Sequence, residues 1–187
     1  MSSTTLAYRL GEPDTECRYP VIIGEDRVIG RAFRWHRNWL VQDSSGERNL
    51  GRPPKGEKGE VMAAAHLVQR YADGLITATR LVTATDEGQA RVFGPAPFLH
   101  PRMPANDRNV EGALKAWAGL ATHLWTPLAG FPGADNPWYL LCDLCGWAGP
   151  RYWSHLRGRN GQPPSAHRHP GCIGEDRVRE RIAAYQK

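Results

Sequence analysis

Apolar and aromatic residues gather in short runs between residues 21 and 51, and small polar turns separate the runs. The densest runs are VIGRAFRW at 28–35 and WLVQD at 39–43, and RNLG at 48–51 follows a turn. β-Branched and aromatic residues bounded by turn residues are typical of β-strands. We therefore predict a small antiparallel sheet of three strands over this region.

The pattern changes to helical spacing after the proline- and glycine-rich loop at 52–59. Apolar residues of 61–72 recur on one face of a helix, and Gly74 ends the pattern. The predicted buried face consists of Val61, Ala64, Ala65, Val68 and Ala72, with Leu67 and Tyr71 at its margin. The strands and this helix form the first predicted domain, residues 1–74.

A connector region is predicted for residues 75–137. It begins with a hairpin whose strands are 75–83 and 89–93, and it continues through the proline-rich stretch 94–104 to a helix over about 108–126. Apolar residues of that helix are spaced like a buried stripe. They are Val110, Leu114, Trp117, Ala121 and Leu124.

The last fifty residues carry the clearest chemical signal. Cys142 and Cys145 are separated by two residues after an apolar run, and Gly146 permits the tight turn that aims both thiols to one side. His169 and Cys172 repeat that spacing, and residues 174–185 read as a helix with acidic residues in its first turn. In an intracellular chain these cysteines indicate a metal site in preference to disulfides.

A cysteine knuckle, a hairpin and then ligands at a helix start is a layout that resembles treble-clef and zinc-ribbon modules, here over residues 138–187. The resemblance implies a structural zinc ion bound by Cys142, Cys145, His169 and Cys172. These modules usually have cysteines in the second pair as well, so His167 and His155 are alternatives for the fourth ligand. Four protein ligands leave no open coordination position, and the ion would stabilise the fold without catalysing a reaction.

The three strands and their helix resemble another group, the DNA-binding domains of the plant ethylene-response-factor type and of integrase arm-binding domains. The resemblance rests on element order and on the rhythm of Trp39, Val41, Asp43 and Gly46. Those domains lay a three-stranded sheet on DNA, which implies DNA in preference to RNA as a partner.

Together the elements predict an α+β fold in three parts. A small antiparallel three-stranded sheet packed on a helix occupies residues 1–74, a hairpin and helix occupy 75–137, and a zinc-stapled treble-clef-like module occupies 138–187.

Basic residues add candidate contacts to a polyanion. The net charge is +5, and residues 138–187 hold most of the excess. Two clusters interleave arginine with aromatic residues, and they supply the predicted nucleic-acid contacts: Arg31, Arg34 and Arg37, and then Arg151, Arg157, Arg159 and Arg168. We expect Phe33, Trp35 and Trp39 to pack beneath the helix at 61–72. Arginine far outnumbers lysine, which is typical of a GC-rich genome such as that of an actinobacterium or its phages.

Catalytic motifs are incomplete. Zinc deaminases require His-x-Glu, which does not occur in the chain. The segment GRPPKGE at 51–57 has the glycine spacing of a phosphate-binding loop, but Glu57 stands where lysine is needed. No acid–base pair with an orienting group is apparent. We expect no enzymatic activity.

The chain has neither an apolar stretch long enough to span a bilayer nor a signal peptide, which predicts a cytoplasmic protein with no membrane partner. Two functions fit. The favoured one is a nucleic-acid-binding accessory or regulatory protein of an actinobacterial phage or mobile element. The other is a protein-interaction factor that binds and inhibits or redirects a host enzyme complex, a function suited to seven tryptophans and a near-neutral first two thirds.

The hexapeptide IGEDRV occurs twice, at 23–28 and at 173–178. The first copy runs into a predicted strand, whereas the second follows Cys172 and opens a predicted helix. Short polar acids suit both a hairpin turn and a helix start. We predict two unlike structures for the two copies.

Overall fold

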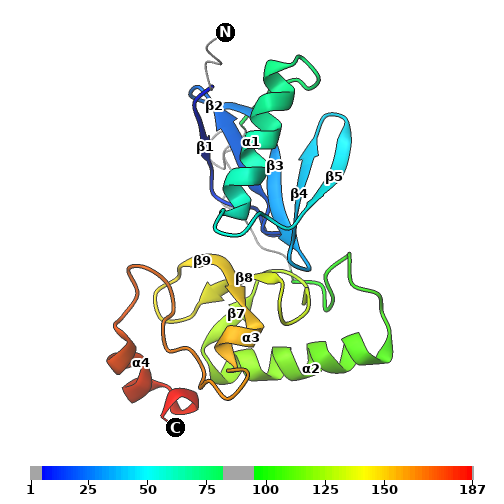
Figure 1. Ribbon diagram of the computed structural model, residues 1–187. Helices are drawn as coiled ribbons and strands as arrows, with labels where there is room; N and C mark the ends of the chain where they lie inside the picture. Colours follow the sequence, from blue (N-terminus) through cyan, green and yellow to red (C-terminus); the bar gives the residue numbers. More distant parts are fainter. Residues whose placement is uncertain (1–5, 82–94, 187) are drawn as a thin grey trace. The chain divides into compact units, whose positions relative to one another are not determined.

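The computed structural model describes residues 6–81 and 95–186 (Figure 1). The chain divides into two compact units, Met1–Val92 and Phe93–Lys187, here called the N-terminal unit and the C-terminal unit. None of the helices in the described ranges has the length and apolar character that crossing a bilayer requires. The division of the chain into three domains stays a prediction.

The described part of the N-terminal unit is built on an antiparallel sheet of six strands. Five of them follow one another in the sheet in chain order, and β6 pairs with the start of β3. The strands are β1 (Tyr8–Leu10), β2 (Tyr19–Ile23), β3 (Arg27–Trp35), β4 (Asn38–Asp43), β5 (Gly46–Gly51) and β6 (Thr79–Arg80).

The prediction of three strands was therefore correct for β3, β4 and β5 but too small for the sheet. Pro20 to Ile23 of β2 are all buried, so this strand lacks the alternation of a half-exposed strand. β1 and β6 have only three and two residues, which is too short to show a period. The second strand of the hairpin predicted for 75–93 lies outside the described residues.

Helix α1 (Gly59–Ala72) covers one face of the sheet (Figure 1). Its buried residues pack with Val21, Ile29, Ala32 and Val41 in the core of the unit. The helix and the sheet approach closely at two glycines, because a Cβ on Gly30 would lie 2.8 Å from a methyl carbon of Leu67 and one on Gly59 would overlap the Trp39 indole.

The face that α1 buries differs from the predicted one. The buried residues are Gly59, Ala63, Ala64, Leu67 and Val68. Val61 is 49% exposed, and Ala65 and Ala72 are exposed as well. An alanine-rich helix offers more than one apolar face, and the close contact with the sheet selects the face with Leu67 and the smallest side chains.

The C-terminal unit combines a long helix with a second antiparallel sheet. Helix α2 (Asp107–Thr122) begins at Asn106, whose side chain accepts a hydrogen bond from the backbone N–H of Asn109, and it packs against β7. The sheet has the order β7 (Trp125–Pro127), β8 (Pro137–Cys142) and β9 (Ala148–Tyr152). The helices α3 (Trp153–Leu156), α4 (Glu175–Arg181) and η1 (Ala183–Tyr185) follow.

The stripe predicted to be buried on α2 is also displaced. The helix buries Ala113, Ala116 and Leu120. Leu114 is 57% exposed, and Val110 and Trp117 are only partly buried. The helix is thus turned so that small side chains face the unit and the larger predicted stripe lies at its edge.

The two IGEDRV segments take unlike structures, as predicted. In the first copy, Ile23 ends β2, Gly24 has φ +58°, and Arg27 begins β3. In the second copy, Gly174 caps α4 and the acids lie in its first turn. The residues that flank each copy therefore decide the conformation of this hexapeptide.

Candidate metal centre

The first pair of candidate ligands lies in the turn of the β8–β9 hairpin. Cys142 is the last residue of β8, and its carbonyl accepts hydrogen bonds from the backbone N–H groups of Cys145 and Gly146 at 3.3 and 2.8 Å. Gly146 has φ +77°, a conformation that glycine adopts without strain. The tight turn predicted from Gly146 is confirmed, and it brings both thiols to one side of the hairpin.

The second pair lies in a tight turn before α4. The backbone N–H of Cys172 donates to the carbonyl of His169 at 3.2 Å. The Nδ1 atom of His169 lies 2.9 Å from the carbonyl oxygen of Pro170. Because a carbonyl can only accept, Nδ1 carries the proton and Nε2 keeps a free lone pair for a metal. The indole of Trp147 stacks on the imidazole with ring centres 4.3 Å apart, which fixes the plane of the ring.

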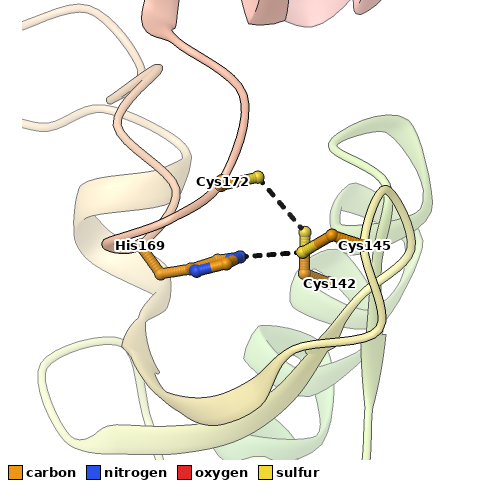
Figure 2. A group of neighbouring side chains, drawn as sticks. All are labelled: Cys142, Cys145, His169 and Cys172. Carbon is orange, nitrogen blue, oxygen red and sulfur yellow. Dashed lines mark hydrogen bonds between the residues drawn. The ribbon is translucent and has the colours of Figure 1, made fainter.

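The four side chains converge on one point, as Figure 2 shows. Their candidate donor atoms all lie within 4.8 Å of one another. The Sγ atoms of Cys142 and Cys172 are 3.9 Å apart, and Cys145 Sγ is 3.1 Å from His169 Nε2. Two sulfurs that share a tetrahedral zinc ion at about 2.3 Å lie about 3.8 Å apart, so the arrangement fits a small tetrahedral ion.

The environment favours a thiolate at Cys142. Burial raises the pKa of this thiol, but the hydrogen bond from Arg168 Nε at 3.1 Å, the backbone N–H of Leu144 and the side chain of His169 outweigh it, and the pKa is lowered to about 7. Burial and then the charge of Cys142 raise the pKa of the Cys172 thiol to about 11. The Cys142 thiol therefore ionises readily, whereas the negative charge of Cys142 opposes ionisation of the Cys172 thiol. A bound cation would offset that charge.

The alternatives for the fourth ligand lie outside this group. Among the described residues the cluster contains His169 as its only histidine. His167 and His155 are both exposed, and the ring of His155 lies against Tyr152. Cys17 is buried in the N-terminal unit, where burial and then Asp14 and Glu16 raise its pKa. The geometry therefore assembles the predicted set of three cysteines and His169.

The first predicted basic cluster lies on and beside the β3–β4 hairpin. Arg31 pairs with Gln42 across the strands, whereas Arg34 pairs with Trp39, which packs with the core under α1. Residues three apart on a strand point to opposite faces, so Arg31 lies on the face away from α1. Arg37 is exposed in the hairpin turn with φ +72°.

The aromatic residues of this cluster divide between the two faces. Trp39 packs beneath α1 as expected. Phe33 does not, because it pairs with Leu40 on the other face, where the guanidinium of Arg18 lies 5.3 Å from its ring centre. Phe33 and Trp35 are two residues apart on β3, so strand alternation puts both on the face away from α1, contrary to the prediction.

Most members of the second basic cluster are engaged within the unit. Arg168 is 1% exposed. Arg151 donates to the carbonyl of His167 at 2.7 Å, and Arg159 forms an ion pair with Asp135 at 2.6 Å. Arg157 is exposed. Of these arginines, Arg168 contacts a candidate metal ligand, Cys142, and its burial leaves it no surface for nucleic acid.

Sequence reasoning missed the residues that surround the ligands. Arg168 was read as a surface contact, although its position directly before His169 is the one local sign of a role in the centre. Trp147 stands two residues after Cys145 and covers His169 across the turn. Neither contact follows from spacing, because each joins segments about 20 to 26 residues apart.

Comparison with protein-family models, with curated proteins and with solved structures finds no match. The resemblances to treble-clef modules and to sheet-plus-helix DNA-binding domains therefore rest on the residues of this chain alone.

Proposed function

We propose that the protein is a non-enzymatic nucleic-acid-binding protein whose C-terminal unit is stabilised by one structural zinc ion. The convergence of Cys142, Cys145, His169 and Cys172 carries the zinc part of this proposal. Three thiolates and an imidazole in tetrahedral range are ligands that zinc prefers, and they fill its four positions. The ion would supply folding free energy to a unit whose ligands come from two separate turns.

Zinc binding is tested by metal analysis of the purified chain. We expect one zinc per chain, and we expect Cys142→Ser to lose the ion and to unfold the C-terminal unit. Cys17→Ser is the matched control, because Cys17 is also buried but lies in the other unit, and it should retain the metal. A folded wild-type chain with no bound metal would refute the zinc centre.

The absence of catalysis is part of the proposal. A filled coordination sphere leaves zinc no position for water or substrate. A cavity of about 300 Å³ in the C-terminal unit is lined by Gly112, Lys115, Phe131, Ala134, Trp153 and Arg157. This lining contains no carboxylate, cysteine or histidine, and its lysine, Lys115, is engaged in an ion pair with Glu111.

The nucleic-acid part of the proposal is carried by the turn of the β3–β4 hairpin. Its two central residues, His36 and Arg37, both have positive φ and are both exposed. Two-residue hairpin turns with positive φ at both central positions favour Asn-Gly, so a histidine and an arginine at these positions strain the backbone. Arg34 and Trp35 precede them directly. A strained, exposed hairpin tip with cations and a tryptophan suits contact with phosphates and bases, and DNA is the favoured partner.

Binding of a fluorescent DNA duplex tests this part. We expect binding at low salt that weakens steeply as salt rises, and we expect Arg37→Ala to reduce both the affinity and the slope of log K against log salt, the slope by about 0.9. Arg80→Ala is the control, because Arg80 is an exposed arginine beside the other end of β3. Failure to bind duplex DNA, single-stranded DNA or RNA at low salt would refute nucleic-acid binding.

A second function is favoured by the apolar edge of α2. Leu114 is 57% exposed, Phe98 is 39% exposed, and Trp117 stacks on Phe98 with ring centres 6.2 Å apart. Adjoining exposed apolar side chains are typical of protein interfaces. In this alternative the chain is an interaction factor that binds a host enzyme complex.

The two functions are separated by Leu114→Lys. A protein partner that is retained after nuclease treatment and lost with this variant would support the alternative. DNA affinity that Leu114→Lys leaves unchanged would support the first function.

A further inference from the structure

Arg168 is a fully buried cation that the proposed function does not yet use. Its side chain is 1% exposed, and it directly precedes the candidate ligand His169. A buried guanidinium is costly unless its donors are bonded and its charge is balanced. The groups that satisfy Arg168 therefore indicate its role.

Three donor atoms of Arg168 reach two separate parts of the unit. Nη1 donates to the carbonyl of His123 at 2.8 Å, Nη2 donates to the carbonyl of Leu124, and Nε donates to Cys142 Sγ at 3.1 Å. The guanidinium carbon also lies 4.2 Å from the centre of a Trp125 ring, within cation–π range. One side chain thus joins the end of α2 to a ligand of the metal centre.

The segment that Arg168 binds is the sharp reversal from α2 into β7. His123 caps the helix, Leu124 has φ +55°, and β7 begins at Trp125. The carbonyl of Leu124 also accepts the backbone N–H of Asp143, the residue after Cys142. A cation is favourable here because the end of a helix carries partial negative charge.

The positive charge of Arg168 balances the negative charge that the centre would have with zinc bound. A zinc ion with three thiolates and a neutral imidazole has a net charge of about −1, from the ligand states that zinc requires. Arg168 contributes the opposite charge within hydrogen-bond distance of Cys142. Without the ion, the ligands that it would hold together, including the Cys142 sulfur bonded to Arg168, lose their common anchor.

We propose that Arg168 is a positioning residue that couples metal binding to the order of the α2–β7 reversal. The inference rests on the proposed zinc centre. It predicts that Arg168 strengthens metal binding by orienting Cys142, and that the bound metal in turn keeps Arg168 on the carbonyls of His123 and Leu124.

The experiment compares Arg168→Met and Arg168→Lys with Arg151→Met in the full chain. Arg151 is the matched control, because it is an arginine that likewise lies near Trp125, at 5.8 Å, but it is only partly buried and donates to the carbonyl of His167. Zinc affinity is measured by competition with a chromophoric chelator. Hydrogen exchange of the His123, Leu124 and Asp143 amides is measured with and without zinc.

We expect Arg168→Met to lower zinc affinity about 10- to 100-fold and to speed exchange at these amides even with zinc bound. Arg168→Lys should be intermediate, because an ammonium keeps the charge but cannot reproduce the planar fork. Arg151→Met should keep near-wild-type zinc affinity. If Arg168→Met fails to fold, Arg168→Lys gives the same two readouts.

Wild-type affinity and exchange in the Arg168 variants, or an equal loss in Arg151→Met, would overturn the coupling while the zinc centre stands. A wild-type chain that binds no zinc would refute the zinc centre itself, and the coupling with it. The wild-type zinc titration therefore tells the two failures apart.

Discussion

At the scale of single residues, the candidate metal centre depends on side chains that carry no ligand atom. Pro170 fixes the tautomer of His169 through its carbonyl, Trp147 fixes the plane of the imidazole, and Arg168 reaches the Cys142 thiol. Such outer contacts orient ligands and tune their charge. A set of four donors becomes a metal site only when its neighbours hold those donors in this way.

The histidine ligand can be tested by three matched substitutions. We expect His169→Ala to lose most of the bound zinc, because it removes a donor within 3.1 Å of Cys145 Sγ. His167→Ala and His155→Ala should bind zinc as wild type does, because both side chains are exposed and lie outside the cluster. Zinc content after gel filtration is the measurement, and loss of zinc in either control would reassign the ligand.

His66 in α1 predicts a pH dependence for the N-terminal unit. Burial, and then the charges of Arg70 and Arg48, lower the pKa of this histidine below 6.5. The unfolded chain therefore binds a proton at a higher pH than the folded chain. The free energy of unfolding is therefore highest above about pH 6.5, where His66 is neutral in both states. It decreases as the pH falls toward the pKa of His66 in the folded chain.

We expect the stability of this unit to fall between pH 7 and pH 5, and His66→Gln to make the fall shallower. Urea unfolding curves at several pH values measure both slopes. Equal slopes in wild type and variant would contradict the prediction.

At the scale of elements, the two long helices, α1 and α2, meet their units largely through alanines. Ala63 and Ala64 of α1 and Ala113 and Ala116 of α2 are fully buried. Small side chains let a helix approach its sheet closely, so the buried face need not be the one with the most large apolar side chains. This packing explains why both predicted helices exist and why both predicted faces are displaced.

The face of α1 predicts unequal effects for two substitutions of similar size. Leu67→Ala should cost about 2–5 kcal/mol, because this side chain is completely buried and its loss leaves a cavity. Val61→Ala should change stability by no more than about 0.5 kcal/mol, because Val61 is 49% exposed. Urea unfolding measures both losses of stability. A loss for Val61→Ala as large as that for Leu67→Ala would support the buried face predicted from the sequence.

The β3–β4 turn predicts that stability and binding can be separated. Arg37→Gly should stabilise the N-terminal unit by up to about 1 kcal/mol, because glycine adopts the observed φ of +72° without strain. Arg37→Ala removes the same charge but keeps the strain. Both variants should bind DNA more weakly, whereas only the glycine variant should unfold at higher urea. Unchanged DNA binding by both would separate this turn from the proposed function.

At the scale of the whole molecule, the two compact units differ in their dependence on metal. All four candidate ligands belong to the unit Phe93–Lys187. The N-terminal unit has its own core, in which Val21, Ile29, Val41 and Leu67 are buried. We therefore expect the two units to respond differently when the ion is removed.

Treatment with a strong chelator should lower the unfolding temperature of the C-terminal unit and leave that of the N-terminal unit nearly unchanged. Hydrogen exchange followed separately in the two units during heating measures this. A common shift of both units would contradict their independence, and no shift in either would contradict the structural role of the metal.

The sequence by itself determined the candidate ligands and the main elements. Cys142 with Cys145, and His169 with Cys172, form tight turns, and a tight turn brings residues three apart together wherever it lies. Strands β3, β4 and β5 and both long helices followed from local composition and period, because those signals act within a few residues of one another. Even the two fates of IGEDRV were predictable from the residues that flank each copy.

Tertiary structure alone decided burial. It selected the faces of α1 and α2, placed Phe33 on the far side of the sheet from α1, and buried Arg168 between a helix end and a thiol. These outcomes depend on which distant segment meets each surface, and no local period specifies that partner. Spacing along the chain set which groups could act together, and packing set which of them are enclosed and which face the solvent.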